Sequence, residues 1–263
     1  MWDESTYWLD WGSNMGAGST VHKQYLDAEI EVLPADGIVH AFVELPDGTL
    51  AWGSEYHIPH SESLVELAPG ADEVDIIWTC QEGYPGSPGA YCSSNGLFYE
   101  ASTDSYLYSF WDESVVVEVD RGTGENLWWA GGVQGGYAFV PPEARFSFQH
   151  GISYTDEGTL LVHTSGLGMD SDLEAREYVV DHAAETLTEL WSFGLGGGSS
   201  MALNGDVWRL PGGNTLHTLG SAGQVIEVTP EGEVVWHLDY QAEHLMGRSG
   251  LIEDLYDLVP PPE

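Results

Sequence analysis

Basic side chains are nearly absent from this sequence of 263 residues. Only 6 residues are Lys or Arg, against 43 that are Asp or Glu, so the formal net charge is -37 at pH 7. Nucleic-acid-binding proteins need basic surfaces that displace counterions from phosphates, so this composition excludes an ordinary member of that class. The same charge disfavours docking on anionic membranes. No run of about 18 apolar residues is present either, which predicts no membrane insertion.

Cysteine is equally scarce, since Cys80 and Cys92 are the only 2 in the sequence. They flank a segment at 83–89 that consists of Gly, Pro, Ser and Tyr and is typical of tight turns. A short loop with a cysteine at each end can close as a disulfide, which favours an extracellular or periplasmic location. Two free buried thiols are the alternative.

Long stretches of helical periodicity are missing as well. Short runs that alternate apolar and polar residues end instead at Gly, Asp, Asn or Pro, a pattern typical of strands joined by tight turns. These runs lie at 41–45, 106–110, 115–119, 159–163, 177–180, 215–219, 225–228 and 233–237. The sequence therefore predicts an all-β protein.

The predicted strands recur in units of about fifty residues that each end with a tryptophan. The closing residues Trp78, Trp128, Trp191 and Trp236 are 50, 63 and 45 residues apart, and we expect them to pack the blades of a propeller. We predict a single β-propeller of five or six blades, each a four-stranded antiparallel sheet. The chain ends would share a closing blade, because sharing removes free sheet edges. A β-sandwich is the competing fold, but it would not need the same unit four times.

The predicted units divide the chain into three parts. Residues 1–37 form an N-terminal segment that supplies a partial blade, residues 38–258 form the β-propeller, and residues 259–263 form a C-terminal tail. No second domain is predicted. Residues 1–37 match no full blade. A further interpretation is therefore that this chain is one part of a longer protein.

Several motifs in the second half of the chain follow one another in the order and spacing of a known family. They are Phe-Ser-Phe-Gln-His at 146–150, Asp-Glu-Gly-Thr-Leu at 156–160, Arg-Glu-Tyr-Val-Val-Asp at 176–181, Gly-Asp-Val-Trp-Arg-Leu-Pro-Gly-Gly-Asn-Thr-Leu at 205–216, Val-Ile-Glu-Val at 225–228 and Gly-Glu-Val-Val-Trp at 232–236. In these motifs the chain resembles the C-terminal half of the periplasmic, cofactor-independent arylsulfotransferases, which are six-bladed propellers. The resemblance extends over residues 38 to 257 and is weaker before residue 90.

The resemblance implies a ping-pong transfer of a sulfuryl group from one phenol to another through a histidine. The family's nucleophile matches His150, a second family histidine matches His40, and a family asparagine matches Asn95. A neutral imidazole is a suitable nucleophile near pH 7. The innermost strand of each blade lines the central channel, so we expect these three side chains to face one funnel.

Some positions depart from the family's pattern. They are Ser93 in place of a histidine, Trp111 in place of an arginine that clamps the sulfate, Gly151 in place of an aspartate, and His163-Thr164-Ser165-Gly166 in place of a Phe-Asp-Asn-Gly turn. Loss of a cationic clamp removes charge stabilisation from sulfuryl transfer. Arg145 and Arg209 are nearest in sequence to the inner strands of the last two blades, so they are the candidates to replace it.

These departures favour a propeller with a degenerate active site that serves as a binding or assembly module. Its partner would be a small phenolic or aryl-sulfate ligand, or another protein. The alternative is an active sulfotransferase that moves a sulfuryl group between phenols through a sulfo-histidine. Neither hypothesis requires a cofactor.

Two further groups of residues have the chemistry of metal ligands. Asp170, Asp172 and Glu174 form an acidic loop whose oxygens suit calcium, with a solvated loop as the alternative. His57 and His60 have a spacing compatible with zinc, but no Cys or third His is near them in the sequence. Calcium is therefore the metal that the sequence favours.

We expect Cys80 and Cys92 to be linked in protein that is made in an oxidising compartment, because the turn-rich segment between them brings its ends together. Mass spectrometry of a proteolytic digest, with and without reduction, tests the link. The two cysteine peptides are expected to separate only after reduction. Two free thiols in secreted material would contradict the prediction.

Overall fold

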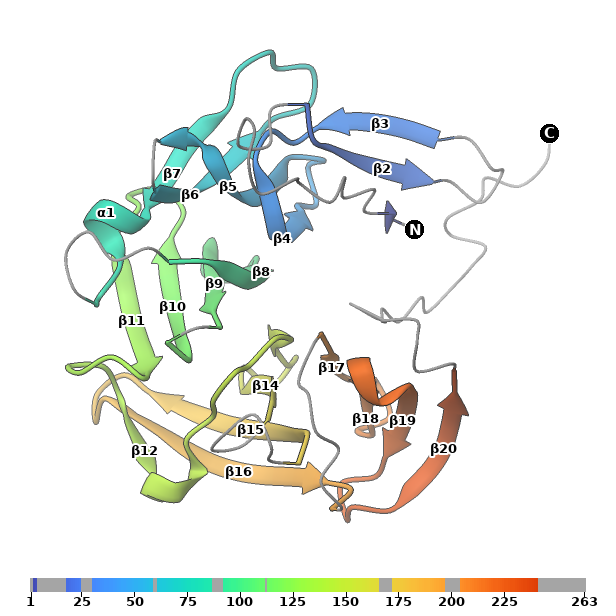
Figure 1. The fold of residues 1–263 in the computed structure, drawn as a ribbon. Coiled ribbons are helices and arrows are strands. Elements are labelled where there is room, and N and C mark those ends of the chain that lie inside the picture. The colour runs from blue at the N-terminus through green and yellow to red at the C-terminus, as the bar shows by residue number, and fades with distance from the viewer. Residues whose placement is uncertain are drawn as a thin grey trace.

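In the computed structural model, the described residues are 2–3, 18–24, 30–58, 61–86, 92–111, 113–165, 172–196 and 204–240. They form five β-sheets arranged around a common centre (Figure 1). The predicted all-β propeller with four-stranded antiparallel blades is thereby confirmed. The helices described are α1 (Cys80–Gly83), η1 (Pro142–Ala144) and η2 (Gly220–Ala222). Within the described ranges, no helix has the length and apolar character needed to cross a membrane.

The five sheets follow one another in chain order. The first contains β1 (Trp2–Asp3), β2 (Thr20–Gln24) and β3 (Ile30–Pro34). The second contains β4 (Ile38–Glu44), β5 (Leu50–Ile58), β6 (Ser61–Leu67) and β7 (Asp75–Thr79). The third contains β8 (Ser94–Glu100), β9 (Ser105–Phe110), β10 (Val115–Asp120) and β11 (Asn126–Gly131).

The last two sheets complete the described part of the chain. The fourth contains β13 (Ile152–Tyr154), β14 (Leu160–Thr164), β15 (Glu174–Asp181) and β16 (Thr186–Gly194), with β12 (Ala138–Val140) added in parallel to β16. The fifth contains β17 (Asp206–Arg209), β18 (Thr215–Leu219), β19 (Gln224–Val228) and β20 (Val234–Asp239).

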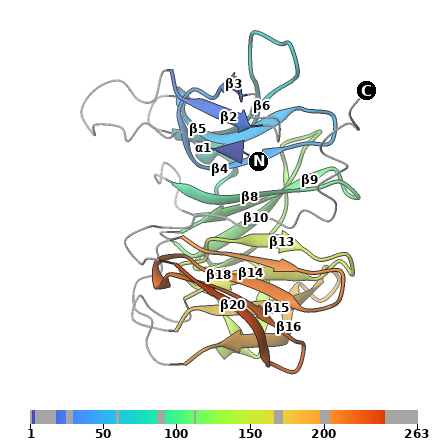
Figure 2. The ribbon, with the colours of Figure 1, turned by 90° about the vertical axis from the view of Figure 1, so that its right-hand side faces the viewer.

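The inner strands β4, β8, β13 and β17 are neighbours in space. Strand β4 contacts β8, β8 contacts β13, and β13 contacts β17. Figure 2 shows β8 between β4 and β13. Each of these strands pairs on one side only, with the next strand of its own sheet. Side chains at corresponding ends of the inner strands can therefore meet even though they are far apart in the sequence.

The same tight turn joins the first two strands of three sheets. After β4, the Leu45 N–H donates to the Thr49 carbonyl (2.8 Å) and the Gly48 N–H donates to the Leu45 carbonyl (2.9 Å). Equivalent bonds surround Gly158 and Gly213, and the three glycines have φ values of 84°, 76° and 88°. Glycine adopts this left-handed conformation without the strain of a side chain. The turn signals in the sequence thus mark the points where the chain leaves the centre.

Trp78 and Trp128 pack against the next sheet, as the sequence predicts, whereas the same prediction is wrong for Trp236, which is 46% exposed on the last strand of the fifth sheet. The Trp78 and Tyr108 ring centroids are 5.5 Å apart, and the Trp78 Nε1–H donates to Asn126 Oδ1 at 2.9 Å. Trp128 stacks on Tyr137 and is fully buried. Aromatic rings bury large apolar areas, so these contacts stabilise the interfaces between blades.

Glutamates in the third strands add polar connections between neighbouring blades. Glu66 in β6 accepts hydrogen bonds from the Tyr106 hydroxyl (2.6 Å) and from Arg121 Nε (2.8 Å) in the third sheet. Glu118 in β10 accepts a hydrogen bond from the Tyr154 hydroxyl of the fourth sheet at 2.9 Å. Charge-assisted bonds of this kind are stronger than neutral ones, and they fix the relative position of the sheets.

A disulfide joins Cys80 at the start of α1 to Cys92, just before β8. The two Cα atoms are 6.2 Å apart, within the range that a disulfide can bridge. The bond closes the connection between the second and third sheets. Pairing in oxidised material stays a prediction until it is measured.

Parts of the predicted organisation lie outside the described residues. The closing blade would need residues beyond 240, and the tail at 259–263 also lies there. The domain boundaries at 37 and 258 stay predictions.

Replacing Trp128 by Ala is expected to lower the free energy of unfolding by about 3–5 kcal/mol, the usual cost of removing a buried aromatic ring. The matched variant Trp236→Ala changes a closing tryptophan that is 46% exposed, whereas Trp128 is 1% exposed. For that variant we expect a loss of about 1 kcal/mol or less. Urea unfolding followed by circular dichroism measures both. Equal losses would contradict the packing described here.

Candidate active site

The starts of three inner strands meet around His150. A side chain at Gly96 in β8 would lie 2.4 Å from the His150 carbonyl oxygen. A side chain at Gly151 would lie 2.4 Å from Asp206 Oδ1 in β17. Because glycine has no Cβ, the third, fourth and fifth sheets can approach one another closely at this point.

The backbone before β13 holds His150 in place. The His150 N–H donates to the His163 carbonyl at 3.1 Å, and the His163 N–H donates to the Gly151 carbonyl at 2.8 Å. The imidazole Nδ1 lies 3.3 Å from the Phe148 carbonyl oxygen. A carbonyl oxygen only accepts hydrogen bonds, so Nδ1 carries the proton and Nε2 keeps its lone pair. Nε2 is therefore the nitrogen available for nucleophilic attack.

The surroundings keep His150 uncharged. Burial, with a smaller contribution from a charge on His40, lowers the pKa of His150 to about 4. The imidazole is consequently neutral at pH 7. Part of the residue remains exposed, which leaves it accessible to a ligand. His40 is an exposed residue of β4.

Asn95 supports the backbone next to His150. Its Nδ2 donates to the Gln149 carbonyl at 2.5 Å, and its Oδ1 accepts a hydrogen bond from Ser109 Oγ at 2.9 Å. Gln149 Nε2 in turn donates to Ser109 Oγ, the Phe110 carbonyl and the Val115 carbonyl, each at 3.0 Å. The structure thus brings Asn95 and His150 together, with Asn95 acting on the main chain.

The surroundings of Gly151, the residue after His150, leave no room for a side chain. A Cβ atom there would lie 2.6 Å from the Asp206 Cα, so the inner strand of the next blade fills the space. Asp206 is buried, and its Oδ2 accepts a hydrogen bond from Trp208 Nε1 at 2.7 Å. Reasoning from the sequence missed Asp206, because only the contact between blades places it beside Gly151.

Trp111 lies next to the loop that carries His150. Its ring centroid is 5.1 Å from that of Phe148. Its buried Nε1 finds no hydrogen-bond acceptor in the described ranges of the chain. An indole N–H is a donor only, so Trp111 offers an apolar wall and one donor here.

Arg145 differs from the other described basic side chains in its lack of a carboxylate partner among the described residues. The other basic residues that are described pair with carboxylates, as in Lys23–Glu44 at 2.6 Å and Arg121–Glu66 at 2.8 Å. Arg145 forms no ion pair within the described residues, and its Nε is buried without a hydrogen-bond partner there. Among the described basic residues, Arg145 is therefore the one for which no carboxylate partner is described.

Arg209 is not brought to this cluster. It ends β17, the strand that Asp206 begins, and its guanidinium hydrogen-bonds Glu177 of the fourth sheet. The guanidinium carbon also lies 5.3 Å from the centroid of the Trp191 ring. Arg209 therefore stabilises the contact between the fourth and fifth sheets, and of the two arginines considered from the sequence only Arg145 remains without a carboxylate.

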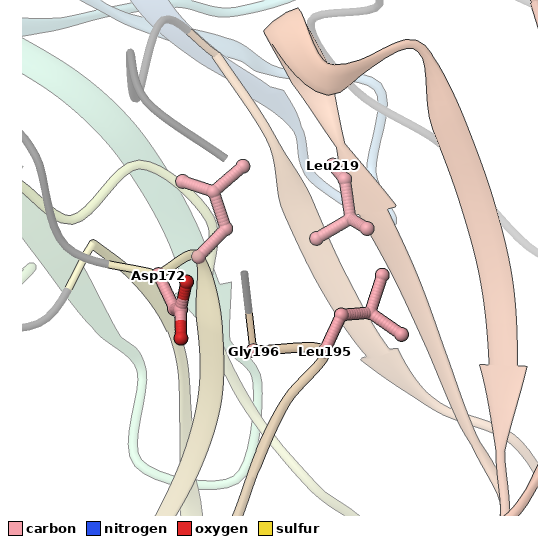
Figure 3. Close-up of a pocket in the computed structure, with 5 residues that line it drawn as sticks. Asp172, Leu195, Gly196 and Leu219 are labelled. Atoms are coloured by element: carbon pink, nitrogen blue, oxygen red, sulfur yellow. The ribbon is translucent and has the colours of Figure 1, made fainter. Parts of the chain in front are cut away.

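The acidic loop proposed for calcium is described only in part, because Asp170 lies outside the described residues. Glu174 is paired with Arg176 at 2.6 Å. Asp172 lies beside Leu195, Gly196 and Leu219 at the surface (Figure 3). Across the described ranges, no three His, Cys, Asp or Glu residues form a group that could hold a metal ion. Calcium binding stays a prediction.

The zinc alternative is likewise only partly described. His57 is partly buried, which lowers its pKa, and His60 lies outside the described residues. Zinc binding by His57 and His60 stays a prediction.

A buried carboxyl group that the sequence did not reveal lies beside the start of β8. Glu62 is fully buried, accepts a hydrogen bond from the Ser94 N–H at 2.8 Å and is hydrogen-bonded to the Tyr108 hydroxyl. Burial raises the pKa of Glu62 to about 7. This side chain therefore joins the second and third sheets as a largely protonated acid below neutral pH.

Two buried histidines were also missed. His163 in β14 and His217 in β18 are fully buried, and their nearest nitrogens, Nδ1 and Nε2, are 2.8 Å apart. Each sits inside a short apolar run, where alternation predicts burial but identifies no partner. The only sequence signal was that His163 replaces a family phenylalanine.

The free energy of unfolding is expected to fall on acidification because of His217. Burial lowers its pKa to about 3 from 6.5, so between these values the unfolded chain binds a proton that the folded chain excludes. This costs about 1.4 kcal/mol of stability per pH unit as the pH falls below 6.5. His217→Gln should make the slope shallower by that amount in urea titrations between about pH 6 and 4. The exposed control His182→Gln should not, and equal slopes in all three proteins would contradict the prediction.

Glu62 is expected to have the opposite pH dependence. Its pKa is raised from 4.5 to about 7, so the folded chain retains a proton that the unfolded chain has lost. The free energy of unfolding therefore falls by about 1.4 kcal/mol per unit as the pH rises through this range. Glu62→Gln should be more stable than wild type at about pH 8 and no more stable at about pH 4, as measured by urea unfolding. The exposed control Glu231→Gln should match wild type at both values, and a Glu62→Gln variant that does so too would refute the assignment.

Comparisons with known structures show which fold is shared. A protein of unknown function from Bacteroides caccae is 17% identical with a TM-score of 0.52, over 85% of this chain and 70% of that chain. The periplasmic gluconolactonase of Pseudomonas aeruginosa is 16% identical with a TM-score of 0.53, over 85% and 64% of the two chains. Virginiamycin B lyase from Staphylococcus aureus is 10% identical with a TM-score of 0.52, over 84% and 63%.

These identities are low, so the matches show a common β-propeller fold and carry no activity over to this chain. The chain spans less than two thirds of the length of the lyase and the gluconolactonase. No curated protein sequence matches it. The sequence profile of the family described as arylsulfotransferase (ASST) matches residues 90–242, which is more than half of the chain and includes Asn95 and His150. The chain therefore belongs to the arylsulfotransferase family.

Proposed function

We propose that this end of the propeller binds aryl sulfates and transfers their sulfuryl group through Nε2 of His150. The state of the imidazole carries the proposal: Nδ1 faces the Phe148 carbonyl at 3.3 Å, and the low pKa keeps the ring neutral at pH 7. A neutral imidazole with its lone pair on the outward nitrogen is a competent nucleophile. Membership of the arylsulfotransferase family, whose profile covers residues 90–242 and thus His150, supports the same assignment.

The reaction has two half-reactions. First, the Nε2 lone pair attacks the sulfur of the aryl sulfate, a nitrogen–sulfur bond forms, and the sulfur–oxygen bond breaks with its electron pair staying on the phenolate. Next, the oxygen of a phenol acceptor attacks the sulfur and loses its proton, while the electron pair of the nitrogen–sulfur bond returns to Nε2. Nδ1 keeps its proton throughout, and its bond to the Phe148 carbonyl strengthens while the sulfo-imidazole ring is positively charged.

Two of the predicted residues have supporting roles in this proposal. His40 is exposed and lies close enough to His150 to influence its charge. It is suited to give a proton to the departing phenolate and to take one from the acceptor. Asn95 holds the carbonyl of Gln149, so it keeps the backbone of the nucleophile in place.

Charge is the main obstacle to binding an anionic donor. A net charge of -37 repels sulfate esters, so a local cation must reverse the field at the site. Arg145 is suited to this task because it has no ion pair within the described residues and a buried Nε without a partner there. Sulfate oxygens would supply the acceptors that Arg145 lacks.

A second candidate function is binding without transfer, in which a degenerate site recognises a phenolic ligand or another protein. Two observations favour it. Trp111 occupies the position of the arginine clamp and packs on Phe148. Arg209 is committed to Glu177 and Trp191, so it is not available to a ligand.

We also propose an extracellular or periplasmic location. The disulfide between Cys80 and Cys92 supports it, since such bonds persist in oxidising compartments. The acidic surface would be best screened in a saline medium or in one rich in divalent cations.

The proposal is tested by incubating the protein with an aryl sulfate that releases a coloured phenolate, together with a phenol acceptor. Release is expected in the wild type and, as for the loss of other nucleophiles, should fall by at least about a thousandfold in His150→Asn. The control His182→Asn changes an exposed histidine and should keep the full rate. Arg145→Gln should mainly raise KM, and Arg145→Lys should restore part of the affinity.

The outcomes separate the two functions. Release that is lost only with His150 supports sulfuryl transfer. Binding of the aryl sulfate, measured by calorimetry and weakened by Arg145→Gln but without release, would replace transfer by the binding function. Absence of both release and binding would refute the assignment of an aryl-sulfate site.

A further inference from the structure

Two buried histidines continue from His150 into the interface between the fourth and fifth sheets. The ring centroids of His150 and His163 are 6.4 Å apart and the ring planes meet at 70°, so one ring lies edge-on to the other. The ring centroids of His163 and His217 are 5.0 Å apart. Three imidazoles, from the loop before β13 and from β14 and β18, thus form a row that leads from a partly exposed residue to fully buried ones.

The two buried rings determine each other's proton position. The distance of 2.8 Å between His163 Nδ1 and His217 Nε2 is that of a hydrogen bond, in which one nitrogen donates and the other accepts. Burial holds the pKa of both residues far below the ordinary value, so both rings are neutral. A change of tautomer in one ring therefore requires a change in the other.

Stability does not account for this pair. The outer nitrogens, His163 Nε2 and His217 Nδ1, are buried and have no hydrogen-bond partner among the described residues. A buried polar group without a partner destabilises a protein, whereas apolar residues of similar volume would fill the same space without this cost. The pair is better explained by an effect on a neighbouring group, and its neighbour is His150.

His150 needs a second constraint on its ring. The contact of 3.3 Å between Nδ1 and the Phe148 carbonyl is long for an N–H···O hydrogen bond, so it orients the imidazole only weakly. His163 supplies a further contact, because its ring lies edge-on to His150 and two main-chain hydrogen bonds hold the two segments together.

The position of His163 is itself tightly defined. A side chain at Gly205 would lie 2.4 Å from His163 Nε2, and Gly205 has a φ of 140°. The backbone of the fifth sheet thus covers one side of the ring, while His217 holds the opposite nitrogen. This leaves His163 little freedom to rotate.

We propose that His163 is a positioning residue for His150 and that His217, through its hydrogen bond, holds His163 in the orientation this requires. The row keeps the proton of His150 on Nδ1 and its lone pair on Nε2. The assignment rests on the proposed function of His150 as the nucleophile. It concerns the orientation of the ring, however, and can be measured without any sulfuryl transfer.

The test is nitrogen NMR of the His150 imidazole at neutral pH in the full chain, where chemical shifts give the ratio of the two neutral tautomers. In the wild type the form protonated on Nδ1 should predominate. His163→Leu removes the ring and should lower the ratio about tenfold, since an orienting contact is worth about as much as one net hydrogen bond. His217→Leu should act in the same direction, and His217→Gln, which retains a hydrogen-bonding group, should restore most of the ratio. The exposed control His237→Gln should leave it unchanged.

A second readout uses diethyl pyrocarbonate, which acylates the unprotonated nitrogen of an accessible imidazole. The rate of His150 modification, followed by peptide mass spectrometry, should fall in parallel with the tautomer ratio. Circular dichroism identifies variants that remain folded, and His163→Phe, which keeps a ring of similar size, serves if His163→Leu does not fold. Ratios and rates within about twofold of wild type in folded His163 and His217 variants would overturn the proposal.

The two hypotheses fail in different ways. A wild type that transfers no sulfuryl group, but whose His150 tautomer depends on His163 and His217, would remove the proposed function and leave the positioning role in place. A wild type that transfers the group with kcat unchanged in folded His163→Leu would overturn the positioning role and leave the function in place.

Discussion

The site is held together by the close contact of neighbouring blades at three glycines. A Cβ atom at Gly96, Gly151 or Gly205 would lie 2.4 Å from the His150 carbonyl, from Asp206 Oδ1 or from His163 Nε2, respectively. These distances are shorter than any van der Waals contact, so a side chain at any of the three positions would have to push two blades apart. The geometry of the site therefore depends directly on how closely the sheets pack at these glycines. Aromatic rings and interblade glutamates stabilise the same interfaces farther from the centre, which keeps the inner strands at this spacing.

Electrostatics divides the protein into a strongly acidic surface and an interior in which carboxylates have hydrogen-bond or ion-pair partners and histidines are neutral. Most of the described basic side chains are used in ion pairs, many of which join two blades, as in Arg121–Glu66 and Arg209–Glu177. Burial keeps the interior histidines neutral and shifts Glu62 towards its protonated form. Such shifts follow from the cost of placing a charge in a poorly solvated environment. Arg145 is the exception, because it is a partly buried cation without a carboxylate partner in the described part of the chain.

The fold alone says little about activity, since propellers with similar architecture include a lyase and a gluconolactonase. What distinguishes this chain is the set of side chains at the starts of its inner strands. His150 offers a neutral nitrogen, Asn95 fixes the adjacent backbone, and the Trp111 indole packs on Phe148. The chain belongs to the arylsulfotransferase family, and His150 is the residue that we propose as its nucleophile. Behind His150, the imidazoles of His163 and His217 are hydrogen-bonded to each other within the interface between two blades. An apolar pair at these positions would pack there but could not form this hydrogen bond.

The sequence by itself determined the elements and their order: alternation indicated the strands, Asp-Gly and Gly-Gly turns marked where they end, and repeated tryptophans indicated a propeller. Its motifs also identified the family and His150 as the candidate nucleophile. Only the tertiary structure decided which residues meet across blades. His163 and His217 are 54 positions apart and each lies in an ordinary apolar run, so local periodicity predicts their burial but not their contact. The same limit applies to Arg209, whose guanidinium hydrogen-bonds Glu177 of the neighbouring blade, and to Trp236, which has the same sequence context as the buried Trp128 but is exposed. The physical reason is that alternation reports which face of a strand is covered, whereas the identity of the covering group depends on the stacking of whole sheets.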